Sequence, residues 1–393
     1  MIIGTSRLND LLRNRRACRN LICALGCFWL MPFYPVLAQA RKATPQSPPL
    51  PSAQVERGEG ATPHKLEWRR HFQSQSGLSP VGVADDGGTL WLITHAGPGK
   101  PKEYVTRIDP EGNLTGNYDP QLPLNLAEWV SYLSPATSGH SAGLLASLAS
   151  GGQQQTFEGA FFLPLGPDGV GAPRRVAGRG PQFPNLVGAG ADEFIAAGDQ
   201  EPLTLLKLDS KGTVIWRRPF SRKLVLPTIA VSADRKILVV SQGGNYLQLQ
   251  LLDESGHPLV SKRIAAKQGT VAADSDGRWA VLLSKGTGGK ENRVHLTVLD
   301  PTLRQISQVE TPLRGRGGRT YQLISTPHGH LIIGESPDER KQIIAEFDRS
   351  ETLMWQREIS AHFTPLLVPF RGGFYVVKDI SEGEGMDVEK YLY

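Results

Sequence analysis

The 393-residue chain is long enough for two average domains, although all-β barrels and propellers of this length also form single domains. Charged residues (21%) and aromatic residues (7%) are at ordinary globular levels, which excludes a disordered or fibrous protein. The formal net charge of +5 rests mostly on five arginines and one aspartate among the first 40 residues, so the basic pI does not indicate a nucleic-acid-binding protein.

Residues 1–40 are typical of a bacterial signal peptide. Arginines precede an apolar run over 21–37, and Ala38-Gln39-Ala40 supplies the small-x-small cleavage pattern. An uncleaved membrane anchor is one alternative, but the run is short for a bilayer and contains two prolines. Lipidation at Cys27 is another, although the preceding residues are a poor lipobox. We expect cleavage before Arg41 and a mature protein without a membrane span, in the periplasm or outside the cell.

The three cysteines, Cys18, Cys23 and Cys27, all lie in this signal segment. The mature chain would therefore have no disulfide, no thiolate nucleophile and no zinc–thiolate site. Residues 41–63 are rich in proline and poor in apolar residues, which predicts a disordered linker. The expected organisation is a signal peptide over 1–40, this linker over 41–63, and one folded domain over 64–393.

From residue 64 onward, short apolar β-prone runs alternate with turn signals, which favours an all-β sandwich, barrel or propeller. The best helical candidate, Leu124 to Leu133, is weak. One unit recurs at intervals of 43 to 57 residues: a strand, then Asp or an equivalent residue, a turn, and another strand. Its turns begin at Asp109, Gly166, Asp209, Asp253, Asp300 and Asp348.

The next unit of this series would begin near the C-terminal "VEKYLY", where the chain ends without the following strand. The N-terminal "HKLEWRRHF" has the pattern of that missing strand. We therefore predict that residues 64–72 complete the last blade beside the C-terminal strand, so that the ring closes without a broken edge.

A second series consists of seven hairpins with Gly or Asp turns, and four of them open with proline, at Pro80, Pro184, Pro227 and Pro365. Proline is tolerated at the start of a strand or on an edge strand, such as the one nearest a propeller axis. Seven inner hairpins and seven outer turns predict a single seven-bladed β-propeller of four-stranded antiparallel blades.

The spacing of Asp209, Gly212 and Trp216 resembles the repeat of pyrroloquinoline-quinone-type propellers. The hairpins "AVSADRKILVVS" and "VAADSDGRWAVLL" resemble YVTN and WD-type repeats. The resemblance covers nearly the whole mature chain and concerns architecture only. It implies that Trp68, Trp216 and Trp355 pack between neighbouring blades.

Candidate catalytic, metal and cofactor sites are weak. Asp274-Ser-Asp276-Gly277 has half the ligands of a calcium loop, but a hairpin turn needs the same residues. His328-Gly-His330 lies in a predicted turn at a spacing unlike a helical metal site. We therefore predict no metal and no cofactor, and assign no catalytic residue, although Ser-His-Asp triads are not visible in a sequence.

The loops between blades, and those between second and third strands, should emerge on one face, here called the loop face. They are rich in Gly, Lys and Arg, which suit carboxylate or phosphate ligands or an acidic protein. The candidate binding residues are Lys100, Arg179, Lys285, Lys290, Arg314, Arg316 and Arg319.

The leading hypothesis is an exported, monomeric, non-catalytic propeller whose loop face binds a protein or an anionic ligand. One alternative is a periplasmic enzyme, either a quinone-type oxidoreductase or a hydrolase with a site in the central channel. Another is an immunity protein that neutralises a toxin. Clustered acids in a deep channel would favour the enzyme, whereas a flat basic or aromatic face would favour a protein partner.

Overall fold

A computed structural model describes residues 55–56, 64–72, 81–95, 103–124, 128–151, 156–199, 203–221, 225–285, 293–314, 321–336, 341–359, 365–379 and 385–393. The chain divides into two compact units, Met1–Leu50 and Pro51–Tyr393, and every described residue belongs to the second. The expected signal peptide and most of the expected linker lie outside the described residues.

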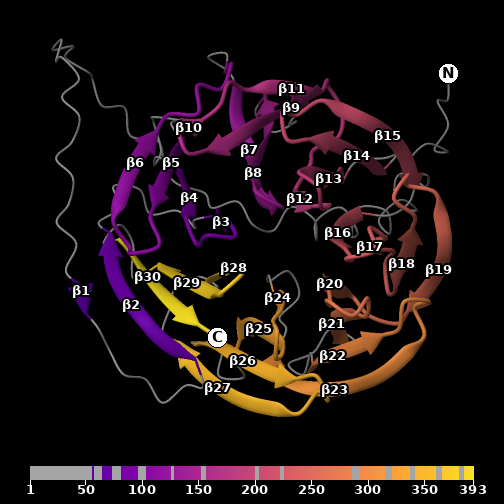
Figure 1. The fold of residues 1–393 in the computed structure, drawn as a ribbon. Helices are drawn as coiled ribbons and strands as arrows, with labels where there is room; N and C mark the ends of the chain where they lie inside the picture. The colour runs from indigo at the N-terminus through magenta and orange to yellow at the C-terminus, as the bar shows by residue number, and fades with distance from the viewer. Residues whose placement is uncertain are drawn as a thin grey trace, which may run out of the picture. The chain divides into compact units, whose positions relative to one another are not determined.

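The second unit is a ring of seven antiparallel sheets, which confirms the predicted seven-bladed β-propeller (Figure 1). In each blade the strands follow one another outward from the axis. The strands of the first three blades are β3 (Val81–Ala84), β4 (Leu90–His95), β5 (Glu103–Ile108) and β6 (Leu114–Tyr118); β7 (Glu128–Ser138), β8 (Ser141–Ser150), β9 (Thr156–Gly166), β10 (Gly169–Val170) and β11 (Arg174–Ala177); and β12 (Asn185–Gly188), β13 (Glu193–Ala197), β14 (Leu203–Asp209) and β15 (Val214–Ser221).

In the second blade, β10 and β11 both pair with β9 and together form a broken outer strand. The next three blades are regular and have four strands each. They comprise β16 (Val225–Val231), β17 (Ile237–Gln242), β18 (Leu247–Leu252) and β19 (Pro258–Ile264); β20 (Gln268–Ala273), β21 (Trp279–Lys285), β22 (Arg293–Leu299) and β23 (Gln305–Arg314); and β24 (Gln322–Ser325), β25 (Gly329–Glu335), β26 (Gln342–Asp348) and β27 (Leu353–Ile359).

The seventh blade is built from both ends of the chain, as the sequence predicted. Its inner strands are β28 (Leu366–Phe370), β29 (Gly373–Asp379) and β30 (Met386–Leu392), and its outer strand is β2 (Lys65–Phe72). Lys65 pairs with Leu392, and Phe72 pairs with Met386. A two-residue strand, β1 (Val55–Glu56), adds to the free edge of β2, so part of the expected linker is paired.

Among the described residues, the hydrophobic core forms seven clusters, and each cluster joins two consecutive blades. The cluster between the seventh and first blades includes Trp68 and Tyr375 with Leu92 and Ile108. Each sheet therefore buries its faces against its two neighbours and has no core of its own. Because burial of apolar surface supplies most of the folding free energy, a blade is stable only as a member of the ring.

The outer turns repeat because Asp at their first position caps the turn. The Asp209 carboxylate accepts hydrogen bonds from the backbone N–H groups of Lys211 and Thr213, at 2.9 and 2.6 Å. Asp253, Asp300 and Asp348 accept the same two bonds in their own turns. In six blades a shift of strand register follows, where the outer strand begins. Such a bulge increases the local twist of the edge strand.

Candidate functional site

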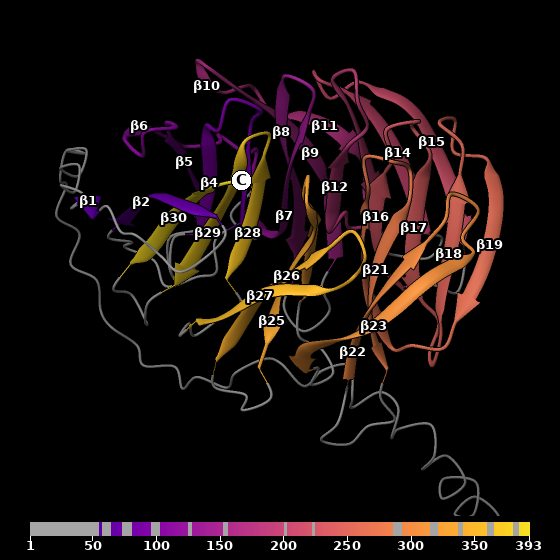
Figure 2. The same cartoon turned by 60° about the horizontal axis from the view of Figure 1, so that its bottom comes forward.

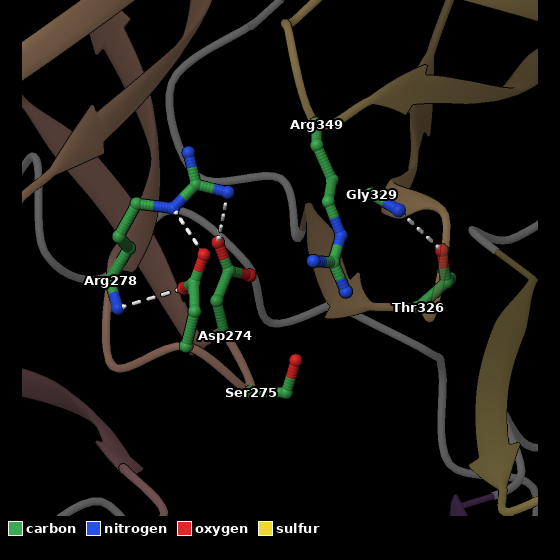
Figure 3. A pocket seen from close by; sticks show the side chains of 7 residues that line it. Asp274, Ser275, Arg278, Thr326, Gly329 and Arg349 are labelled. Carbon is green, nitrogen blue, oxygen red and sulfur yellow. Dashed lines mark hydrogen bonds and ion pairs between the residues drawn. The ribbon is translucent and has the colours of Figure 1, made fainter.

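A recess lies on the face formed by the inner and outer turns, which we call the turn face, opposite the loop face. It lies between the fifth and sixth blades, is shallow and is partly open to solvent. The inner turns of both blades and the outer turn of the sixth contribute to it (Figure 3). Its lining residues are Asp274, Ser275, Asp276, Arg278, Thr326, Gly329 and Arg349.

The half calcium loop singled out in the sequence is the inner turn of the fifth blade. Asp274 N–H donates to Arg278 O (2.9 Å), Gly277 N–H donates to Asp274 O (3.1 Å), and Gly277 has a φ of 84°. Gly277 thus provides the left-handed conformation that closes the hairpin. Arg278 Nε lies 2.8 Å from Asp276 Oδ2, so an arginine of the turn neutralises this carboxylate.

Asp274 is the acceptor of a buried network that joins the two blades. Its Oδ1 accepts a hydrogen bond from Ser325 Oγ (2.7 Å), and His330 Nε2 lies 3.0 Å from the same oxygen. Burial opposes the ionisation of Asp274, but the bonds from His330 and Ser325 outweigh it and lower the pKa of this carboxyl. Ser325 donates to the carboxylate and not to the imidazole. The imidazole therefore cannot take the hydroxyl proton, and this arrangement does not activate Ser325 as a nucleophile.

A second buried pair, His64 and Glu346, involves β26 of the sixth blade. His64 Nε2 is 2.6 Å from Glu346 Oε2, and both side chains are 3% exposed. Trp355 Nε1 donates to the same oxygen at 2.7 Å. Burial raises the pKa of Glu346, but the bonds from His64 and Trp355 lower it further than burial raises it. The residue preceding β2 is thereby tied to the sixth blade, next to the ring closure.

The two motifs that the sequence presented separately, Asp274-Ser-Asp276-Gly277 and His328-Gly-His330, therefore meet through Asp274 and His330. Within the described parts of the chain, no group of three or more His, Cys, Asp or Glu side chains is arranged to hold a metal ion. The ring of His328 lies 6.4 Å from that of His64, whereas His330 faces Asp274. The two histidines thus make different contacts.

The three tryptophans expected between blades differ in burial. Trp68 is 4% exposed and donates its indole N–H to Pro110 O of the first blade at 2.9 Å. Trp216 and Trp355 are half-buried. A Cβ on Gly112 would lie 3.0 Å from the Trp68 indole, and one on Gly256 would lie 3.1 Å from that of Trp216. Both indoles therefore lie over a glycine in the outer turn of the next blade. That they wedge the blades together energetically stays a prediction.

The predicted basic residues of the loop face are only partly described. Lys100, Lys290, Arg316 and Arg319 lie outside the described residues. Arg179 Nε lies 2.6 Å from Glu158 Oε2, Lys285 Nζ donates to Gln308 Oε1 at 2.9 Å, and Arg314 Nη1 lies 3.2 Å from Glu310 Oε1. Each of these three cations binds a neighbouring side chain, and no contact among the described residues joins one to another.

The loop-face end of the third blade also carries an acidic group. Asp199 follows β13, and its N–H donates to Gln182 O at 3.0 Å. Burial raises the pKa of Asp199 to about 6, because its backbone hydrogen bonds compensate only part of the desolvation. The loop face therefore combines paired cations with a carboxyl group that titrates close to neutral pH.

Exposed apolar side chains recur at one place on four consecutive blades. Of the eight large apolar residues exposed in the described parts of the chain, seven lie within the first three residues of β15, β19, β23 and β27. These outer strands follow one another around the rim of the ring (Figures 1 and 2). The second residue of each strand is 48–59% exposed, and we call these four residues the rim row: Ile215, Leu259, Ile306 and Met354.

No protein-family model matches the chain, and no curated protein matches it. Among solved structures, it is similar to one described as the Dos1 propeller, with 13% identity, a TM-score of 0.46, and coverage of 82% of this chain and 93% of that one. It is also similar to the crystal structure of BamB from Moraxella catarrhalis, with 13% identity, a TM-score of 0.47, and coverage of 82% of this chain and 93% of that one. A third similar structure is that of a protein of unknown function from Bacteroides caccae, with 16% identity, a TM-score of 0.43, and coverage of 71% of this chain and 98% of that one. The strand topology itself establishes that this chain is a seven-bladed β-propeller.

Proposed function

We propose that the protein is an exported, non-catalytic binding or scaffold propeller that holds a protein partner against its rim. The observation that carries this proposal is the rim row. Single apolar residues scattered over a surface are ordinary, but these four occupy the same structural place in four successive blades. Free edge strands are normally protected by charged residues, so apolar residues there favour a surface that a partner covers.

The first blade provides a contrast within the same molecule. The second residue of its outer strand β6 is Thr115, which is exposed and polar. In the seventh blade, the second residue of β2 is Leu66, which is half-buried, and β1 pairs with the edge of β2 at Arg69 and Arg70. Apart from Tyr132 in the second blade, the large apolar residues exposed in the described parts of the chain lie in the third to sixth blades, and this arc defines the expected interface. The loop face was the surface favoured by the sequence, but its three described cations already have partners.

Export is supported by the arginine-rich start, the apolar run and the Ala-x-Ala pattern, and by the absence of cysteine after Cys27. The described residues include no helix with the length and apolarity needed to cross a membrane. N-terminal sequencing of the protein recovered from the periplasm should give Arg41 as the first residue. Recovery of the intact apolar segment, or of acylated Cys27, from the membrane fraction would contradict this expectation.

Binding is tested by comparing the two surfaces. The full-length chain is used to capture a partner from a periplasmic extract, and the affinity of the purified pair is then measured. A rim variant carries serine at all four positions of the rim row, and a loop variant carries glutamate at Arg179, Lys285 and Arg314. We expect the rim variant to bind at least tenfold more weakly and the loop variant to bind within about twofold of the parent.

Thr115→Ser, at the equivalent place on the first blade, is the matched control for a change at an outer strand. If the loop variant loses binding and the rim variant retains it, the interface is on the loop face and the rim proposal is wrong. Circular dichroism of each variant establishes that it is folded before its affinity is interpreted. Exposed substitutions of this kind should change stability by less than about 0.5 kcal/mol each.

A further inference from the structure

The recess between the fifth and sixth blades contains a cation, Arg349, that has no counter-ion among the residues that the structure describes. Arg349 is exposed, and its guanidinium extends into the recess from the outer turn of the sixth blade (Figure 3). No ion pair or hydrogen bond to its side chain is found within the described residues. The carboxylate of its neighbour Asp348 already accepts hydrogen bonds from the N–H groups of Ser350 and Thr352, with which it caps its own turn.

The two acids of the recess do not compensate Arg349. Asp274 accepts from Ser325 and His330, and Arg278 Nη2 lies 3.8 Å from its other oxygen. Asp276 is held by Arg278 Nε at 2.8 Å. Both carboxylates belong to the fifth blade and already have partners, whereas the Arg349 guanidinium enters the recess from the sixth.

The recess also provides a hydroxyl donor. Ser275 is exposed at the tip of the inner turn of the fifth blade, and its Oγ has no hydrogen-bond partner within the described parts of the chain. Thr326, by contrast, is engaged, since its Oγ1 accepts from Gly329 N–H at 3.0 Å and contacts Glu346 Oε1 at 3.4 Å. The donors left for a ligand are thus the Arg349 fork and the Ser275 hydroxyl, one on each blade.

We propose that this recess binds a carboxylate group, with Arg349 as the charged donor and Ser275 as the neutral one. A guanidinium donates two parallel N–H bonds to the planar oxygens of a carboxylate, and a hydroxyl supplies a third bond. The charges of Asp274, Asp276, Arg278 and Arg349 sum to zero. The carboxylates of Asp274 and Asp276 in the lining repel a phosphate dianion more strongly than a singly charged carboxylate. The site lies on the turn face and does not depend on the rim row.

The test uses sodium trifluoroacetate as the probe and the full chain as the protein. Binding is measured at constant ionic strength as broadening of the fluorine NMR line of the probe. The Arg349→Gln variant should bind the probe at least tenfold more weakly, because it loses the charge and the fork. Ser275→Ala should bind it two- to fivefold more weakly. Arg304→Gln is the matched control, since Arg304 is also an exposed arginine in an outer turn but does not line the recess.

Competition identifies the source of the carboxylate. Displacement of the probe by the peptide acetyl-Gly-Glu-Gly-amide assigns the site to an acidic side chain of a protein. Displacement by acetate alone assigns it to a small free acid. The proposal is wrong if neither competes, if phosphate competes at lower concentration than acetate, or if Arg349→Gln and Arg304→Gln both bind like the parent. The rim variant should bind the probe normally, so this result is independent of the proposed partner.

Discussion

Replacing Trp68 by alanine tests whether an outer-strand tryptophan holds the closing blade to the first. Its side chain is 4% exposed, lies 5.7 Å from the ring of Tyr375, and covers Gly112 of the next blade. Truncation of a buried tryptophan to alanine costs about 3–5 kcal/mol, and the near-complete burial places Trp68→Ala at about 4 kcal/mol. The lost indole bond adds little, because Pro110 O keeps a hydrogen bond from Lys390 Nζ at 2.8 Å.

Equilibrium urea unfolding, monitored by circular dichroism, measures this loss, and calorimetry should show a melting temperature lower by about 6 °C. Trp68→Phe keeps an aromatic ring and removes the hydrogen bond, so it should cost only about 1–2 kcal/mol. Trp216→Ala should cost about half as much as Trp68→Ala, since Trp216 is half-buried. A loss below about 1 kcal/mol for Trp68→Ala would refute the idea that this residue is a wedge.

Three further predictions concern the ring and its charges. Deleting Lys65–Phe72 should lower the melting temperature and broaden the transition in calorimetry, because β30 loses its outer partner and keeps only β29; an unchanged transition would contradict closure by this strand. Gly112→Ala should cost about 1–2 kcal/mol more than Gly190→Ala in urea unfolding: both have positive φ, of 84° and 74°, but only the first has side chains within 4 Å of the new Cβ. The folded pKa of Asp199 is raised to about 6, so its ionisation destabilises the fold as pH rises from about 4 through 6. Asp199→Asn should therefore increase the melting temperature at pH 7.5 and have little effect at pH 4, and equal effects at both values would contradict the shift.

The repeat was predictable because its physical cause is local. Asp209 and its equivalents cap the outer turn with their own carboxylates, so each must lie at a fixed distance from the following strand. The third residue after Asp adopts a positive φ, and glycine fills it in three blades. In the fifth and sixth blades, Leu303 (67°) and Glu351 (60°) adopt the same conformation. The glycine signal therefore weakens along the chain although the turn is retained.

The candidate site was not predictable because its contacts join separate blades. Asp274 and His330 are 56 residues apart, and His64 and Glu346 are 282 residues apart. Nothing local in either hairpin reveals which blade it will face. Tertiary pairing also explains why the weak helical candidate, Leu124 to Leu133, is not a helix from Glu128 onward. These residues belong to β7, which pairs with β8 over its whole length.

Closure by both termini has a consequence for biosynthesis. Lys65 pairs with Leu392, so β2 must wait on the ribosome or in transit until 327 further residues have been made. At about 5–20 residues per second this takes about 16–65 s, during which the apolar faces between the last and first blades have no cover. A product that stops eight residues early, at residue 385, lacks the whole of β30 and cannot mask those faces. Chains without β30 would remain open to chaperones and proteases, so the pairing of β30 with β2 distinguishes a closed ring from an open one.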